Sequence, residues 1–252
     1  MTVVLLTAAN PGPLTGAGNN TWLIDGAEPT LVDAGIGAAE HLDAIAAALG
    51  GRPLARVLVT HGHHDHAGGI PALTSRWPSI EVCKWTGGVI RGWRRLHDGD
   101  VVRAGDDELV TVHTPGHAED HACFWHAPAR ALFAGDMLIA GTTVMIPEGR
   151  GGDLADYLAS LERLKALGPA RVYPGHGPII DRPVELIDEY LAHRALRDRQ
   201  ILACLADGVT DVDSIVARIY TDVPAGVLPA ARLTVQAHLK KLGKAMTPPD
   251  RS

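Results

Sequence analysis

Four times along this chain, a short apolar run that is typical of a buried strand leads to a histidine or an aspartate within a few residues. The four runs are residues 57–60, 109–113, 131–133 and 171–173. Side chains on short loops at strand ends can converge from distant sequence positions onto one rigid edge of a sheet. The pattern therefore favours a strand-rich α/β domain with a polar site at one edge of its sheets.

Further runs complete this pattern and divide the chain into two parts. Strands are also predicted at residues 3–6, 21–25, 30–33, 80–83 and 122–125. Helices are predicted at residues 38–49, 70–76 and 154–167. From a helix that begins near Val184 onward, only helices are predicted. We therefore predict a first domain over residues 1–190 and a small helical domain over residues 191–252.

The composition excludes several classes of protein. Hydrophobic residues make up 46% and charged residues 21% of the 252 residues, which is typical of a globular chain and not of a disordered one. The three cysteines are too few and too scattered for a disulfide framework or a CxxC zinc site. No signal-peptide pattern or stretch of roughly 20 apolar residues is found. We therefore expect a cytoplasmic protein that does not bind membranes.

The densest group of potential metal ligands is the segment THGHHDHAGG, residues 60–69. Imidazole nitrogens and carboxylate oxygens suit zinc and similar cations. A tight loop after the strand can direct His61 and His63 to one metal ion, and Asp65 and His66 to another. We expect His64 to be an exposed spacer.

Three later motifs each place one polar side chain after a strand. They are TPGH with His117, FAGD with Asp136 and YPGH with His176. Taken alone, Asp136 is typical of a helix cap. His121 fits two interpretations: a partner that orients a metal ligand, or a satisfied buried histidine. Together and in this order, the motifs predict one shared metal centre.

These motifs resemble those of the metallo-β-lactamase superfamily, over roughly residues 1–190. The resemblance implies an αββα sandwich with two divalent metal ions at the edge of its sheets, zinc by default and iron or manganese as alternatives. It implies one ion bound by His61, His63 and His117. It implies that the second ion is bound by Asp65, His66 and His176, and that Asp136 bridges the two.

The resemblance also implies a metal-dependent hydrolase. Two such ions hold a water between them and lower its pKa towards ~7, so no serine or cysteine nucleophile is needed. Asp65 is then the candidate catalytic residue that orients the water or moves its proton. Zinc β-lactamases of the main clinical type have a cysteine where this chain has Asp136, and flavo-diiron oxygen reductases have a glutamate in place of His63. These departures disfavour antibiotic hydrolysis and oxygen reduction.

A narrower resemblance extends over nearly the whole chain. NPGPLTGAGNNTWLI, GDMLIAGTTV and AHRALRDRQIL resemble the β-lactamase-like protein 2 subfamily. This implies a C-terminal winged-helix-like module and, by analogy with mammalian members, endoribonuclease activity on single-stranded RNA. The sequence after Leu242, GKAMTPPDRS, offers little that could form a β-wing. The candidate substrate contacts are Asn20, Thr142, Thr143 and Trp93, the last within the basic run 91–95.

Charge leaves the substrate open. Residues 191–252 carry nine Lys/Arg against six Asp/Glu, a net charge of +3. Because the whole chain has a net charge of −6, residues 1–190 have a net charge of −9. A phosphodiester substrate such as single-stranded RNA and a small thioester or lactone both fit the metal motifs. An acidic main domain favours the small molecule, because nucleic-acid affinity depends on phosphate neutralisation. A nucleic-acid-binding regulator with a vestigial metal site is the alternative of another class. The C-terminal helices also suit a homodimer surface.

Overall fold

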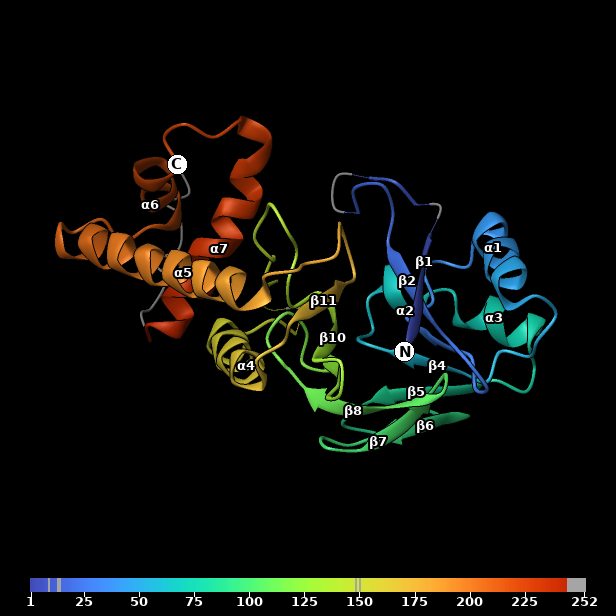
Figure 1. Ribbon diagram of the computed structural model, residues 1–252. Coiled ribbons are helices and arrows are strands. Elements are labelled where there is room, and N and C mark those ends of the chain that lie inside the picture. Colours follow the sequence, from blue (N-terminus) through green and yellow to red (C-terminus); the bar gives the residue numbers. More distant parts are fainter. Residues whose placement is uncertain (9, 13–14, 148, 150, 244–252) are drawn as a thin grey trace.

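The computed structural model describes residues 1–8, 10–12, 15–147, 149 and 151–243. Two β-sheets pack face to face, and helices cover the outer face of each (Figure 1). The predicted αββα sandwich is therefore confirmed. Among the described helices, none is long and apolar enough to cross a membrane.

The first sheet has six strands in sequence order. They are β1 (Thr2–Thr7), β2 (Asn20–Asp25), β3 (Thr30–Val32), β4 (Arg56–Val59), β5 (Glu81–Trp85) and β6 (Trp93–Leu96). The first three pair antiparallel, whereas β3, β4, β5 and β6 pair parallel. Loops that follow parallel strands leave from the same edge of a sheet, and the loop after β4 carries His61.

The second sheet has five strands in the order β11-β10-β9-β8-β7. They are β7 (Val101–Ala104), β8 (Asp107–His113), β9 (Ala122–His126), β10 (Ala131–Gly135) and β11 (Arg171–Pro174). Only β10 and β11 pair parallel in this sheet. Strands β6 and β7 were not predicted, because WRRL and VVRA are short, charged segments without a continuous apolar run.

Three apolar clusters hold the four layers together. Trp22, Leu58, Phe124 and Phe133 are among the residues buried between the two sheets. Helices α1 (Ala39–Leu49) and α3 (Ile70–Arg76) cover the first sheet through residues such as Ile45, Leu49 and Leu73. Helices α4 (Leu154–Leu167) and α5 (Pro183–Ala206) cover the second sheet through residues such as Tyr157, Leu161 and Ile187. Burial on both faces explains why the central strands are continuous apolar runs.

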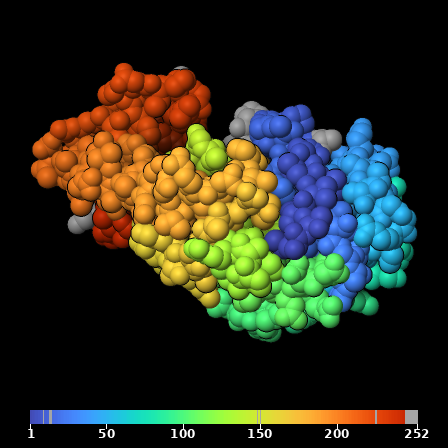
Figure 2. Space-filling model, in the orientation of Figure 1, coloured from blue at the N-terminus to red at the C-terminus, as the bar shows by residue number. Residues whose placement is uncertain are grey.

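The C-terminal helices form a separate lobe beside the sandwich (Figure 2). Helices α6 (Val212–Ile219) and α7 (Leu228–Lys241), with the 3₁₀ turn η1 (Ala225–Val227) between them, pack around the end of α5. Helix α5 runs without a break through the predicted domain boundary at residue 190. Residues 244–252, which hold most of the segment predicted to lack a β-wing, lie outside the described residues.

Candidate metal centre

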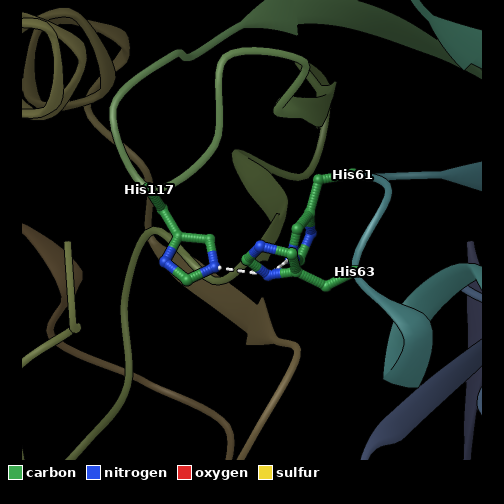
Figure 3. Close-up of side chains that lie close together, drawn as sticks. All are labelled: His61, His63 and His117. Carbon is green, nitrogen blue, oxygen red and sulfur yellow. Dashed lines mark hydrogen bonds between the residues drawn. The ribbon is translucent and has the colours of Figure 1, made fainter. Parts of the chain in front are cut away.

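Three histidine rings converge at one edge of the sandwich (Figure 3). His61 and His63 precede the short helix α2 (His64–Ala67), and His117 lies in the loop between β8 and β9. The Nε2 atoms of His61 and His117 lie 2.9 and 3.0 Å from Nδ1 of His63. His64 is exposed, as predicted. It belongs to none of the donor groups found among the described residues.

A second group of donor atoms lies beside the first. Nε2 of His66 and Nε2 of His176 each lie 3.4 Å from Oδ1 of Asp136. The same two nitrogens lie 3.7 and 3.5 Å from Oδ2 of Asp65. The other carboxylate oxygen of Asp136, Oδ2, lies 3.6 Å from Nε2 of His117. The carboxylate of Asp136 therefore presents one oxygen to each group.

The protons on the rings leave lone pairs that point into the centre. A carbonyl oxygen only accepts, so Nδ1 of His117 donates to Met145 O over 2.9 Å and its Nε2 faces the other ligands unprotonated. Nδ1 of His66 donates to Oδ2 of Asp33 over 2.7 Å, so its Nε2 also faces the centre. Burial opposes protonation of this ring, but Asp136 and Asp33 raise the pKa of His66 well above its usual value, so a bound metal ion would replace the proton on Nε2. Converging lone pairs repel one another unless a cation lies among them, so this donor set fits metal ions.

Burial and charge set the protonation of the centre. Burial and the charge on His66 lower the pKa of His61 well below its usual value, which keeps this ring neutral. Burial opposes ionisation of Asp136, but the charge on His66 and the proximity of the His176 ring hold its pKa well below the usual range. Oδ1 of Asp136 is buried and has no hydrogen-bond partner among the described residues. A charged, unsatisfied oxygen in a buried site is a further fit to a cation.

Comparison with known families agrees with this geometry. The sequence model of the metallo-β-lactamase superfamily matches residues 14–176. The chain belongs to this superfamily. The model of the β-lactamase-associated winged helix domain matches residues 212–245, so the predicted C-terminal module is confirmed.

Relatives of this metallo-β-lactamase superfamily member include enzymes. A β-lactamase-like protein 2 homolog of Caenorhabditis elegans is 38% identical over 96% of this chain and 84% of its own length. An atrochrysone carboxyl ACP thioesterase of Aspergillus chevalieri is 34% identical over 89% of this chain and 75% of its own length. The predicted class of metal-dependent hydrolase is therefore confirmed.

Solved structures show the same architecture. A β-lactamase domain protein from Burkholderia ambifaria has a TM-score of 0.79 and 26% identity, covering 96% of this chain and 85% of its own. TTHA1623 in a di-iron-bound form has a TM-score of 0.58 and 28% identity, covering 72% of this chain and 96% of its own. A neighbour with two iron ions agrees with the implied use of metal by the fold.

Two residues that sequence reasoning missed support the ligands. Asp33 follows β3 in a left-handed conformation, with φ of 64°. Its Oδ1 accepts the backbone N–H of Thr60 over 2.8 Å, and its Oδ2 orients His66. Asn19, 1% exposed, donates from Nδ2 to Oδ2 of Asp65 over 2.9 Å. The turn VDAG after a strand was a usable signal for Asp33, whereas nothing in the sequence separated Asn19 from its neighbour.

His121 contacts the backbone of a predicted ligand. Its Nε2 accepts the N–H of Asp136 over 3.2 Å, so Nδ1 carries the proton and faces Thr114 Oγ1 at 2.9 Å. Gly135 precedes Asp136 with a positive φ of 46°, and a Cβ there would lie 2.6 Å from this Nε2. Of the two interpretations of His121, these contacts favour the partner that orients a ligand.

A cleft opens directly onto the ligands. Its volume is about 350 Å³, and beyond the ligands it is lined by Ile139, Thr142, Thr143, Val144, Met145 and Pro147. Thr142 and Thr143 thus lie where the sequence placed substrate contacts. None of the described residues that line the cleft is a lysine or an arginine.

The other two predicted contacts lie differently. Nδ2 of Asn20 donates to the carbonyl oxygens of Pro174 and Gly177, so this residue holds the turn that carries His176. Trp93 begins β6 and packs against the cluster beneath α1 and α3. Because β6 runs parallel to β5, its first residue lies at the edge opposite the ligands. The prediction that Trp93 borders the site is therefore wrong. Most of the basic run 91–95 belongs to β6, which is an edge strand of the first sheet.

Proposed function

We propose that this chain is a dinuclear metal hydrolase that cleaves a thioester or ester of an apolar acyl group. His61, His63 and His117 would hold one ion, Asp65, His66 and His176 the other, and Asp136 would lie between them. Two bound divalent cations would supply an acidified water and positive charge for a developing oxyanion. The observation that carries the proposal is a complete set of converging donors at the floor of a mostly apolar cleft, whose described lining includes no lysine or arginine.

Asp65 is the residue that would accept a proton in this reaction. Burial opposes its ionisation, but hydrogen bonds from His176 and Asn19 and the charge on His66 hold the pKa of Asp65 well below its usual range. It is therefore a carboxylate at neutral pH. Asp65 also lines the cleft, so it can orient a water and accept its proton.

The walls of the cleft support an acyl substrate. Ile139, Val144 and Met145 offer apolar contact to an acyl chain, and Thr142 and Thr143 offer hydroxyl groups. A polynucleotide needs positive charge along its backbone, and the described cleft residues include no lysine or arginine to supply it. The relative named as an acyl-carrier thioesterase supports the same class. The basic run 91–95, a predicted contact for an anionic substrate, is not among the described residues that line the cleft.

A side-by-side assay tests the proposal. Zinc-loaded protein would receive S-lactoylglutathione, an S-acyl pantetheine, an acyl-homoserine lactone, bis(p-nitrophenyl) phosphate and a fluorogenic single-stranded RNA. We expect thioester or lactone turnover that is lost with His63→Ala and kept with His64→Ala, a matched exposed neighbour. Cleavage of RNA without acyl hydrolysis would overturn the acyl assignment and favour the nuclease.

A further inference from the structure

The cleft wall after Asp136 is bonded to helix α5. The hydroxyl oxygen of Tyr190 lies 2.7 Å from Ile139 O and 2.6 Å from Thr142 O, and it accepts the N–H of Ile139 over 3.3 Å. Nη2 of Arg194 donates to Val144 O over 2.6 Å. In Figure 1 the yellow-green loop that follows β10 lies beside the orange α5. Two side chains of one helix therefore fix the backbone of residues 139–144.

Arg194 is a buried cation. The side chain is 3% exposed, and no carboxylate pairs with it within the described residues. Its guanidinium lies over the ring of Tyr157 at 6.0 Å, and Val144 O accepts a hydrogen bond from it. Burying a cation without a counter-ion is costly, so the carbonyl and the ring face are what compensate it.

The same loop reaches a metal ligand. Met145, next to Val144, accepts the proton of His117 Nδ1 through its carbonyl oxygen at 2.9 Å. This bond directs Nε2 of His117 towards His63 and Asp136. A shift of the loop would therefore change both the cleft wall and the orientation of one ligand.

The next turn of α5 holds the C-terminal lobe. The guanidinium of Arg197 lies 4.1 Å over the ring of Tyr220, at the end of α6. Asp198 accepts from Nδ1 of His238 over 2.7 Å and pairs with Lys241, both on α7. The motif AHRALRDRQ, which the proposed chemistry does not use, thus joins the lobe to the cleft.

We propose that Tyr190 and Arg194 are positioning residues for the metal centre and its cleft, and that the C-terminal lobe anchors the helix that carries them. They act by holding residues 139–145 so that Met145 orients His117 and the threonines face the cleft. The role of the cleft in substrate binding rests on the proposed function, but the order of the loop and the affinity for metal do not.

Three variants test this inference. Arg194→Met removes the cation, Tyr190→Phe removes one hydroxyl with its ring kept, and Arg199→Met changes an exposed arginine on the same helix as the control. Hydrogen–deuterium exchange would follow residues 139–145, and a competition titration would give zinc affinity. Hydrolysis of p-nitrophenyl acetate would separate kcat from KM.

We expect exchange in residues 139–145 to rise about tenfold or more in the first two variants, with zinc affinity weakened by about 10- to 100-fold, as for other partners of metal ligands. KM should change more than kcat. Arg199→Met should match the parent chain. Unchanged exchange and zinc affinity in a folded Tyr190→Phe or Arg194→Met would overturn the inference, as would a uniform rise over all segments. Failure of the parent chain to cleave any ester would count against the proposed function, while exchange and zinc binding still decide this inference.

Discussion

Two buried histidines in this molecule each face an aspartate, and their pKa values move in opposite directions. At the metal centre, burial opposes protonation of His176, but the carboxylates of Asp136 and Asp65 raise its pKa to about 9. In the C-terminal lobe, burial dominates and lowers the pKa of His238 to about 4, although Asp198 opposes this. Besides burial, the charges on Arg194 and Lys241 lower the pKa of His238, and Lys241 also pairs with Asp198.

This contrast distinguishes a site that binds a cation from one that holds helices together. Around His176, two carboxylates lie within 3.5 Å of Nε2 and favour the protonated ring, although the charge on His66 opposes it. Around His238, burial and the charges on Arg194 and Lys241 outweigh the one carboxylate, and the ring stays neutral at neutral pH. The arrangement of carboxylates, more than the presence of histidine, therefore separates the two sites.

The largest expected effect comes from removing the carboxylate between the two donor groups. Asp136→Asn keeps the shape but loses the charge, so both groups lose their shared ligand. We expect hydrolysis to fall by at least about 100-fold in steady-state kinetics, the effect of losing one strong electrostatic contact in an active site. Asp188→Asn, an exposed aspartate on α5, is the control. A smaller loss of hydrolysis would contradict the view that the carboxylates set the metal centre apart from the His238–Asp198 pair.

Lowering the pH should reduce the stability of the C-terminal lobe, because His238 becomes protonated. A folded-state pKa of about 4, below the ordinary 6.5, means that its stabilising contribution is present above about pH 6.5 and is lost as the pH falls towards 4. The contribution is on the order of 2–3 kcal/mol. Urea unfolding followed by circular dichroism between pH 7 and 4.5 measures it. In His238→Gln the acid dependence should be weaker; an identical dependence would rule out this histidine as its source.

Raising the pH should increase the affinity for zinc, because His176 loses its proton. Below a pKa of about 9 the metal-free ring is protonated, so zinc must displace this proton. We expect zinc affinity to rise at least about tenfold per pH unit up to about pH 9, and calorimetry in buffers of different ionisation enthalpy to detect the released protons. A pH-independent affinity from pH 7 to 9 would show that the site holds no such proton.

The smallest effect on catalysis should come from Trp93. Trp93→Leu alters the edge opposite the ligands, so kcat/KM for an acyl substrate should not change measurably. The free energy of unfolding should fall by about 1–2 kcal/mol, because half-buried aromatic packing is lost. Loss of activity in a stable variant would bring this edge back into the substrate site.

The sequence was informative where each feature depends on local signals. Strands of the sheet centres and helix α4 followed from apolar runs and periodicity, and helix α1 ends at left-handed Gly50 as its sequence predicted. The donors could be predicted to converge because each follows a strand at one sheet edge. Contacts of Asn19, His121 and Arg194 could not, because they join segments whose proximity only the fold creates. Strand β6 was not predicted because its two arginines interrupt the apolar pattern of a strand.

Metal stoichiometry tests the central claim most directly. Metal-free protein would be titrated with zinc, and the bound metal measured by mass spectrometry after removal of excess. The account predicts two ions per chain in the parent protein and no more than one in Asp136→Asn. A parent chain that saturates with one ion, or a variant that still binds two, would contradict a dinuclear centre bridged by Asp136.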